Sequence, residues 1–336
     1  MMQERLIEYM KDPGSYPERP GNITLVQTHI SWVFIGDEYV YKIKKPVDFG
    51  FLDFTSLEKR RFYVREELRL NKRFSPDIYL SVVPISEGKG SFVIGNSSNI
   101  VEYALKMKRI NEDRMLYRLL EAGQATPGLM KRLGRHMADV YRKIPSDEKA
   151  KPYGSLDTIS KNVIENFEQT FKYIGGPVSG GAYNKIQSWS MSFMEDNKSL
   201  FEKRMDGGHI KDCHGDLHLQ HICMDDKRIV IFDCIEFNER FRFGDVASDI
   251  AFLSMDLDYN GREDLRKAFV DAYIDASRDC MLRNVLKFYK IYRAYVRAKV
   301  ASFMLDDTGL DAATKDIAYQ KAKSYYELAL KYVKHE

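Results

Sequence analysis

The sequence has no run of apolar residues long enough to cross a membrane. A spanning helix needs about 20 of them, and the apolar runs here are far shorter. The first ten residues mix charged and apolar side chains, so they also lack the apolar core of a secretory signal. We therefore expect a protein that stays in the cytoplasm and does not contact membranes.

Cysteine is scarce, with four in 336 residues at irregular spacing and no Cys-x-x-Cys pair. This excludes a disulfide framework and does not match a zinc site, which needs closely spaced thiolates or imidazoles. Because three cysteines lie near His214 and His221, a metal site with histidines is an alternative. Small buried cysteines are common in protein cores, so packing is the preferred interpretation. The cysteines are Cys213, Cys223, Cys234 and Cys280.

A strong charge of one sign is also missing. The formal net charge is +3, with 30% charged and 44% apolar residues, so bulk charge predicts no polyanionic partner. Segment 281–300 is basic with interleaved tyrosines, but the chain has no known nucleic-acid motif, and we expect no nucleic-acid partner. At 336 residues the chain exceeds the roughly 250–300 that one hydrophobic core serves, which predicts two lobes.

Glycine-rich phosphate-binding motifs are absent. The sequence contains no G-x-x-x-x-G-K-[ST] motif, and the turn at 28–32 has no glycine. The sequence therefore has no P-loop of this type.

The most informative segment is 212–236. It contains a His214-Gly-Asp216 loop and then an apolar β-run, 229–232, which ends at Asp233. A hairpin between them would bring both carboxylates to one end. Phosphoryl transfer uses this combination, because one carboxylate orients the acceptor hydroxyl and another holds the Mg²⁺ that neutralises the phosphates.

This segment resembles the catalytic and metal-binding loops of the aminoglycoside phosphotransferase-like kinases, which have a protein-kinase-like fold. Residues 39–84 and 214–258 are most similar to the kinase-like half of bacterial fused aminoglycoside phosphotransferase and ATP-binding proteins, and this sequence lacks their P-loop motif. The resemblance implies an α+β, bilobal fold. A small antiparallel-sheet lobe over 1–107 would bind the nucleotide, and a larger helical lobe over 108–336 would carry the catalytic and metal loops and the acceptor-site helices.

The resemblance assigns roles within 212–236. Asp216 corresponds to the catalytic residue that orients the acceptor hydroxyl, and His214 is expected to brace its loop. Asp233 corresponds to the metal ligand, and Glu236 is expected near the acceptor. His221 stands where the family has a metal-binding asparagine. Because Mg²⁺ prefers oxygen to imidazole, this difference predicts a weakened second metal, use of Mn²⁺, or a pseudokinase that only binds the nucleotide.

The expected first lobe begins with strands at 23–27, 31–35 and 38–44. Alternation places Lys42 and Lys44 on one face of the last strand, where one of them can reach the nucleotide phosphates. Lys42 fits the family's strand lysine better. The alternative is a solvated edge strand, on which lysines are common.

A helix is predicted to follow from the capping-box pattern at 55–58. Glu67 falls inside the apolar stripe of this helix, where burial of an unpaired carboxylate would cost roughly several kcal/mol of folding free energy. We therefore expect Glu67 to pair with Lys42, as in kinases. The alternative is an exposed Glu67 among the surface ion pairs of a charged helix.

Three further residues complete the predicted nucleotide site. The β-run at 99–110 is predicted to lead into the hinge between the lobes, where the resemblance implies that Met107 to Arg109 contact the base through backbone groups. Ser31 is expected to donate to the phosphates from its backbone and hydroxyl. The implied cofactors are ATP or GTP with Mg²⁺, or else Mn²⁺.

The second lobe is predicted to be mainly helical. Asp245 is expected to cap one of its helices, and Asp249 to anchor the backbone of the catalytic loop. Helices are predicted at 116–122, 127–144, 156–172 and 182–203.

The acceptor is predicted from segment 281–300, in which Lys287, Lys290, Arg293 and Arg297 share one helical stripe. If the stripe lines the acceptor cleft, it repels polycations such as aminoglycosides, and Arg293 and Arg297 bind a neutral or anionic sugar or metabolite. The alternative is a solvated basic face. The sequence thus predicts a phosphotransferase that moves the γ-phosphate of ATP or GTP to a hydroxyl of such a molecule.

Overall fold

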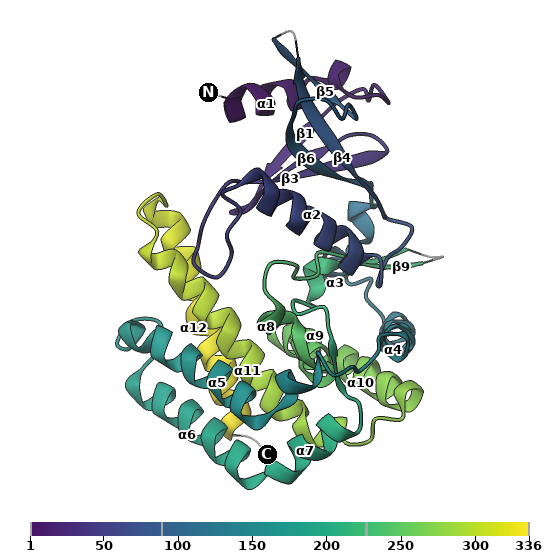
Figure 1. Cartoon of the computed structure of the whole chain (residues 1–336). Coiled ribbons are helices and arrows are strands. Elements are labelled where there is room, and N and C mark those ends of the chain that lie inside the picture. The colour runs from purple at the N-terminus through teal and green to yellow at the C-terminus, as the bar shows by residue number, and fades with distance from the viewer. Residues whose placement is uncertain (1, 89, 226–227, 335–336) are drawn as a thin grey trace. The chain divides into compact units, whose positions relative to one another are not determined.

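The computed structural model describes residues 2–88, 90–225 and 228–334. An antiparallel sheet occupies part of its N-terminal third, and most of the remainder is helical (Figure 1). The predicted α+β fold class is confirmed. None of the described helices combines the length and the apolar character needed to cross a membrane.

The chain divides into two compact units. The first consists of Met1–Leu119 together with Gln220–Glu239, and the second of Leu120–Leu219 together with Arg240–Glu336. The segment predicted to carry the metal ligand therefore packs with the N-terminal unit, although it follows the first part of the helical unit in sequence.

Six antiparallel strands form the sheet of the first unit, in the order β1-β2-β3-β6-β4-β5. β3 pairs with β2 on one side and with β6 on the other, so it is an inner strand. The alternative of a solvated edge at Lys42 and Lys44 is therefore wrong. The strands are β1 (Thr24–Gln27), β2 (Ser31–Ile35), β3 (Tyr39–Lys44), β4 (Tyr79–Gly88), β5 (Ser91–Ile94) and β6 (Ile100–Lys108).

The two faces of β3 have different environments, as strand alternation requires. Tyr41 and Ile43 are buried in an apolar core that includes Leu6 and Met10 of α1 (Met2–Lys11). The lysines at alternate positions lie on the opposite face, which α2 (Leu57–Asn71) packs against. α3 (Leu116–Glu121) completes the helices of the first part of this unit.

α2 begins at Ser56, whose hydroxyl accepts a hydrogen bond from the Lys59 N–H at 3.2 Å. The cap is thus one residue later than the first residue of the predicted pattern. The buried face of α2 is partly polar, and its buried Arg60 is satisfied by the Glu102 carboxylate at 2.8 Å. Burial of polar groups on this face is possible because they are paired.

Segment 220–239 forms a short hairpin of β8 (Ile222–Met224) and β9 (Ile229–Ile231). The Ser75 hydroxyl, just after α2, donates to the Ile231 carbonyl and accepts from its N–H, both at 2.8 Å. This attachment fixes the end of β9, from which Asp233 follows.

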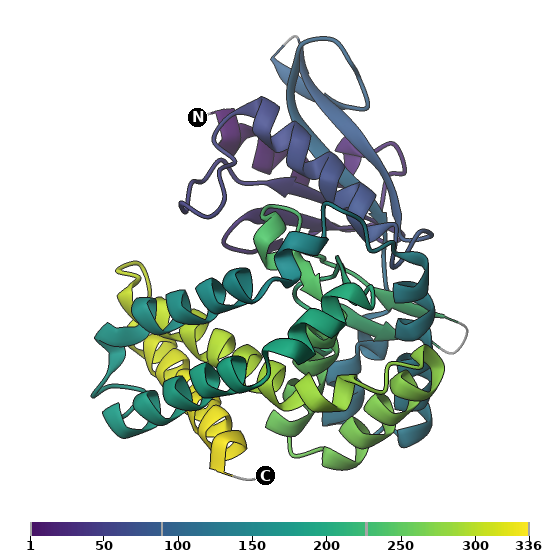
Figure 2. The ribbon, with the colours of Figure 1, turned by 60° about the horizontal axis from the view of Figure 1, so that its bottom comes forward.

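The second unit is mainly helical (Figure 2). The predicted helix 182–203 is interrupted at Asn197, whose N–H closes one helix on the Phe193 carbonyl at 3.1 Å before the next begins. A two-stranded sheet of β7 (Ile210–Asp212) and β10 (Phe243–Asp245) precedes α9. The helices are α4 (Pro127–Lys143), α5 (Leu156–Thr170), α6 (Gly180–Asp196), α7 (Lys198–Asp206), α8 (Glu239–Arg242), α9 (Val246–Tyr259), α10 (Glu263–Ser277), α11 (Leu282–Phe303) and α12 (Ala312–Lys334).

All four cysteines lie in the described residues, and no disulfide joins them. Cys213, Cys223 and Cys234 are buried, whereas Cys280 is exposed. The packing interpretation is confirmed for the first three.

Candidate active site

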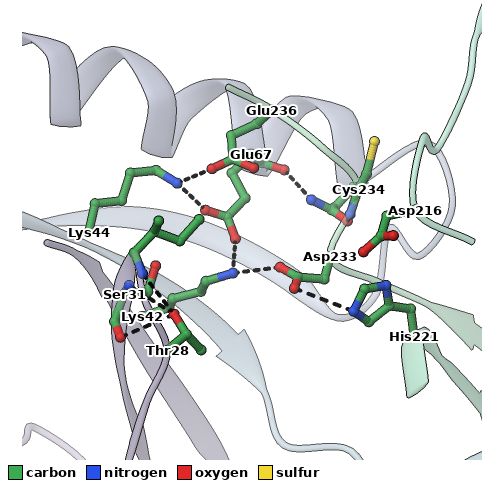
Figure 3. A network of polar contacts seen from close by, with 12 residues as sticks. Thr28, Ser31, Lys42, Lys44, Glu67, Asp216, His221, Asp233, Cys234 and Glu236 are labelled. Atoms are coloured by element: carbon green, nitrogen blue, oxygen red, sulfur yellow. Dashed lines mark hydrogen bonds and ion pairs between the residues drawn. The ribbon is translucent and has the colours of Figure 1, made fainter. Parts of the chain in front are cut away.

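The site of the first unit is built on β3 and α2. Lys42 Nζ lies 2.8 Å from one carboxylate oxygen of Glu67, and Lys44 Nζ lies 2.8 Å from the other (Figure 3). The Glu67 side chain is only 1% exposed. The predicted Lys42–Glu67 ion pair is confirmed, and the alternative of an exposed Glu67 is wrong.

Asp233 joins this network through Lys42, whose Nζ lies 2.6 Å from its carboxylate. The second carboxylate oxygen lies 3.7 Å from His221 Nε2. The backbone of Asp233 has φ of +64°, a left-handed conformation that costs free energy in a residue other than glycine. Strain of this kind persists where surrounding contacts impose it, which is common at functional sites.

Two hydrogen bonds impose that backbone conformation. The Asp233 N–H donates to the Tyr79 hydroxyl oxygen at 3.0 Å, and the Cys234 N–H donates to Asn71 Oδ1 at 2.9 Å. Tyr79 begins β4 and Asn71 ends α2. Sheet and helix together therefore fix the direction of the Asp233 carboxylate.

Glu236 was predicted near the acceptor, but it is buried and forms an ion pair with Lys44. Lys44 thus contacts two carboxylates, those of Glu67 and Glu236 (Figure 3). Both ends of the short segment 233–236 are tied to lysines of the same strand.

Three carboxylates and two ammonium groups therefore share one region of the first unit. Burial alone would lower the pKa of Lys42, but the Asp233 and Glu67 carboxylates more than offset it and hold the pKa well above its usual range. Burial would raise the pKa of Glu67, but the two lysines leave it lowered. For Glu236, burial prevails and the pKa is raised. Lys42 therefore remains a cation at neutral pH.

The three other residues predicted to contact the nucleotide, Ser31, Met107 and Arg109, lie on strands of the first unit or directly after one. Ser31 begins β2, opposite Lys44 in the strand register, and its N–H donates to Thr28 Oγ1 at 2.9 Å. The Ser31 hydroxyl is buried without a hydrogen-bond partner among the described residues. Met107 lies in β6, and the Arg109 N–H donates to the Glu38 carbonyl at 2.7 Å. The Arg109 amide is thus already engaged within the unit.

The loop with Asp216 belongs to the second unit. Gly215 has φ of +86°, which lets the chain turn between His214 and Asp216. Asp249 of α9 accepts hydrogen bonds from the N–H groups of His214 at 2.7 Å and Gly215 at 3.1 Å. The predicted anchor is confirmed, and so is the predicted cap at Asp245, which accepts from the Ala247 N–H at 2.9 Å.

Two histidines flank the Asp216 carboxylate. His214 is fully buried, and its Nδ1 accepts a hydrogen bond from the Asp216 N–H at 3.2 Å, which is the bracing contact expected of it. His218 Nε2 lies 3.4 Å from the Asp216 carboxylate, which is itself 33% exposed. Asp216 is thus held at its backbone while its carboxylate remains accessible.

Arg293 supports the same loop from α11. Its guanidinium donates to the Gly215 carbonyl and the Ser248 hydroxyl, both at 2.9 Å, and lies 3.6 Å from the Asp249 carboxylate. The residue is 9% exposed. Arg293 therefore holds the loop that contains Asp216, whereas it was predicted to contact the acceptor.

The rest of the basic stripe is also partnered within the second unit. Lys290 pairs with Asp258 at 2.8 Å, and the Lys287 ammonium lies 5.2 Å from the centre of the Trp189 ring. The Arg297 guanidinium lies 5.6 Å from the Tyr325 ring centre. Burial would lower the pKa of Arg297, but Tyr325 and then Asp216 more than offset it and the pKa is raised. The stripe is therefore not simply a solvated basic face.

The donor set of the first unit suits a nucleotide with a divalent cation. The Asp233 carboxylate is 43% exposed, and carboxylate oxygens are the ligands that Mg²⁺ prefers. The nearby His221 imidazole is softer and suits Mn²⁺ better. The Lys42 ammonium, a compact charge, suits phosphate oxygens.

Solved structures share this fold. A choline/ethanolamine kinase family protein from Mesorhizobium loti has a TM-score of 0.54 and 12% identity over 99% of both chains. A GDP complex of an aminoglycoside 2′-phosphotransferase-IIIa has a TM-score of 0.55 and 9% identity over 97% of this chain and 99% of that one. The chain therefore shares the fold of these kinases, which is the protein-kinase-like fold that was predicted.

The sequence comparison narrows the class. Residues 201–283 match the family model of the phosphotransferase enzyme family, which includes the aminoglycoside phosphotransferases, so the predicted resemblance is confirmed. An uncharacterized protein of Mycobacterium tuberculosis is 29% identical over 278 residues, which are 83% of this chain and 54% of that protein. The chain spans about half the length of the curated relatives that it matches.

Sequence reasoning missed Tyr79 and Asn71, and it gave Lys44, Glu236 and Arg293 other roles than the supporting ones they have in the structure. Tyr79, Asn71 and the Lys44–Glu236 pair hold the segment at Asp233, and Arg293 holds the loop at Asp216. One signal was available, since Asn71 lies four residues after Glu67 and hence on the same helix face. The other partners come from distant parts of the sequence, which periodicity does not reveal.

Proposed function

We propose that this chain is a phosphotransferase that moves the γ-phosphate of ATP or GTP to a hydroxyl of a small molecule. The observation that carries the proposal is the position of Lys42, whose side chain is 12% exposed and which bridges the carboxylates of Glu67 and Asp233. Kinases use a lysine held by a helix glutamate to position nucleotide phosphates, beside an aspartate that holds the metal. The match of residues 201–283 to the phosphotransferase family model supports the proposal. So does the structural neighbour aminoglycoside 2′-phosphotransferase-IIIa, which was solved as a GDP complex.

The roles follow from the contacts within each unit. Lys42 would hold phosphate oxygens, and Asp233, beside His221, would hold Mg²⁺ or Mn²⁺. When bound, the metal supplies positive charge that neutralises the phosphates. Because the Lys42 ammonium lies 2.6 Å from Asp233 in this structure, nucleotide binding would exchange one cation at that carboxylate for another.

Asp216 would orient the acceptor hydroxyl and accept its proton. Its backbone is fixed by His214 and by the loop contacts of Asp249 and Arg293, so its exposed carboxylate can be directed at a reacting oxygen. A general base of this kind contributes about 10²–10⁴-fold to a rate.

One observation favours a second candidate, a pseudokinase that binds the nucleotide without turnover. His221 replaces the oxygen ligand of the family and lies 3.7 Å from the metal aspartate. Its imidazole would weaken a second Mg²⁺.

The test is transfer from ATP or GTP to a panel of sugars, sugar acids and phosphorylated metabolites, with Mg²⁺ or Mn²⁺. We expect Asp216→Asn to lower kcat by about 100-fold or more while nucleotide affinity stays within about threefold. The control is Asp264→Asn, an exposed carboxylate of α10 paired with Arg262, which should leave both unchanged. Equal and negligible turnover in wild type and Asp216→Asn, with nucleotide still bound, would establish the pseudokinase instead.

A further inference from the structure

A second group of polar residues in the second unit has no part in the proposed chemistry. It lies where α5 packs against α11 (Figure 1). Arg240 of α8 reaches it by donating to Glu165. We call it the α5–α11 cluster. Its members are Asn162, Glu165, Asn166 and Gln169 of α5, Lys299 of α11, and Arg240.

Lys299 is the central cation of the α5–α11 cluster. Its ammonium donates to Asn166 Oδ1 at 2.6 Å and to Gln169 Oε1 at 3.0 Å, which are both neutral amide oxygens. The nearest acidic side chain, Glu165, is instead engaged by the Arg240 guanidinium at 2.8 Å. Among the described residues no carboxylate lies within ion-pair distance of Lys299.

Two amide atoms beside Lys299 lack partners. Asn166 is 4% exposed, and its side chain is aimed at Lys299 through Oδ1, yet its Nδ2 has no hydrogen-bond partner among the described residues. Asn162 Oδ1, one helical turn earlier, is also buried and without a partner within the described ranges. A buried amide group that makes no hydrogen bond costs free energy, and such cases call for an explanation.

The unmet groups specify a ligand chemistry. Lys299 supplies a positive charge, and Asn166 Nδ2 supplies a neutral donor, so together they suit an anionic oxygen. Asn162 Oδ1 is an acceptor and suits a hydroxyl. Burial lowers the pKa of Lys299 to about 8, as expected for a cation that lacks a carboxylate partner and lies near the Arg240 charge.

One helix, α11, contributes both to the loop of the proposed base and to the α5–α11 cluster. α11 carries both Arg293, which contacts the Asp216 loop, and Lys299, six residues further along. At about 1.5 Å per residue these positions are about 9 Å apart along the helix. Arg297, between them, is influenced by the Asp216 charge. The same helix therefore links the cluster to the region in which the Asp216 charge acts.

We propose that the α5–α11 cluster binds an anionic group, a phosphate or a carboxylate, of a hydroxylated acceptor, with Lys299 and Asn166 as its ligands and Asn162 as a contact to a hydroxyl. The inference rests on the proposed function, because it names the substrate class for the same reaction. It assigns the anion to residues other than Arg293, which the catalytic loop occupies.

The first test measures binding of inorganic phosphate, so that it does not depend on turnover. We expect Lys299→Met to weaken phosphate binding at least tenfold in a calorimetric titration. Lys185→Met, which removes an exposed lysine from α6 of the same unit, is the matched control and should bind like wild type. Lys42→Met is included to distinguish phosphate bound at the proposed nucleotide site from phosphate bound at the α5–α11 cluster. Loss of binding in Lys42→Met with unchanged binding in Lys299→Met would overturn the proposal.

A second variant guards against misfolding of Lys299→Met. Asn166→Asp puts a carboxylate on Lys299 at the position of the present Oδ1, so the fold is retained while the cation is neutralised. We expect it also to lose phosphate affinity at least tenfold. Phosphate binding equal to wild type in a folded Asn166→Asp would contradict the proposal.

The kinetic test compares glycerol with glycerol 3-phosphate and with glycerate, which distinguishes the two kinds of anion. We expect glycerol 3-phosphate or glycerate to have at least tenfold higher kcat/KM than glycerol. Lys299→Met should raise its KM at least tenfold with little change in kcat or in nucleotide KM. A preference for glycerol that Lys299→Met leaves unchanged would refute the anionic subsite while leaving the phosphotransferase intact. Absent turnover with every acceptor would count against the proposed function alone, and the phosphate titration would then decide the subsite.

Discussion

At the scale of single residues, Asp233 shows how a functional group is positioned against its own backbone preference. Its left-handed φ of +64° is unfavourable for aspartate. The hydrogen bonds that the Asp233 and Cys234 N–H groups donate to Tyr79 and Asn71, and the ion pair with Lys42, compensate for this cost. The segment is secured again three residues later, where Glu236 pairs with Lys44. We infer that Lys44 and Glu236 are positioning residues for the Asp233 carboxylate.

This inference predicts the effect of Glu236→Gln. Removing one partner of a buried ion pair costs roughly 3–5 kcal/mol, and Lys44 retains Glu67, so we expect a loss of about 2–3 kcal/mol of unfolding free energy. The affinity for Mg²⁺ in the phosphotransfer assay should fall more than that for the acceptor, because Asp233 is released. Chemical denaturation and metal-dependent kinetics measure the two effects.

The double variant Lys44→Met, Glu236→Leu provides the control. Replacing both charges by apolar groups of similar size leaves no unpaired ion and should recover most of the stability. Metal affinity should remain impaired, since the tie at residue 236 is then apolar. If metal affinity is normal in both variants, the pair has no positioning role.

At the scale of elements, two helices hold the Asp216 loop of the second unit. α9 provides Asp249, which accepts two backbone N–H groups of the loop and a hydrogen bond from the Tyr141 hydroxyl of α4. α11 provides Arg293, which donates to the Gly215 carbonyl. Backbone donors and an acceptor of the turn are thus satisfied by side chains of two helices, and the loop is ordered without regular structure of its own.

Asp249→Asn should loosen this loop. The substitution retains one acceptor oxygen but removes the charge, and hydrogen bonds to charged groups contribute roughly 1.5–3 kcal/mol each. We expect a loss of about 2 kcal/mol of stability and a fall in kcat of about tenfold or more, with nucleotide KM nearly unchanged. Asp271→Asn, a partly exposed carboxylate of α10 paired with Arg283, is the matched control. A kcat equal to wild type would show that the anchor does not position Asp216.

At the scale of the whole molecule, two partly buried histidines tie stability to pH. Burial lowers the pKa of His136 on α4 and of His209 before β7, and the Arg204 charge lowers that of His209 further. A lowered folded-state pKa means that the unfolded chain binds protons more readily. The stabilisation is therefore present above the unfolded pKa of about 6.5 and is lost as the pH falls through and below it.

Urea unfolding at pH 7.5 and 5.5 measures this dependence. We expect His209→Gln to reduce the loss of unfolding free energy between the two pH values, at a slope of at most about 1.4 kcal/mol per pH unit for one site. His29→Gln, which changes an exposed histidine, should retain the wild-type loss. Carboxyl groups also contribute to the pH dependence, and Glu236, whose pKa is raised, contributes with the opposite sign. Because these contributions are the same in all three proteins, they cancel when the variants are compared with wild type. Equal losses in all three proteins would contradict the prediction.

Local sequence patterns determined where several elements and candidate site residues of this protein lie. Alternation and turn residues located β2 and β3, and the position of Glu67 in an apolar stripe predicted its pairing with Lys42, because an unpaired carboxylate could not be buried there. The His-Gly-Asp loop, the aspartate after an apolar strand and the Asp249 anchor were equally local patterns, and the resemblance supplied their roles.

The tertiary structure alone decided which distant groups became partners. Glu236 and Arg293 have the composition of ligand-binding residues, yet packing turned one toward Lys44 and the other toward the Gly215 carbonyl. Lys299 and Asn166, unremarked in the sequence, were left with unmet polar atoms at a helix contact. Periodicity shows which face a side chain occupies, but its partner depends on which element covers that face, and contacts between residues far apart in sequence are set only when the chain folds.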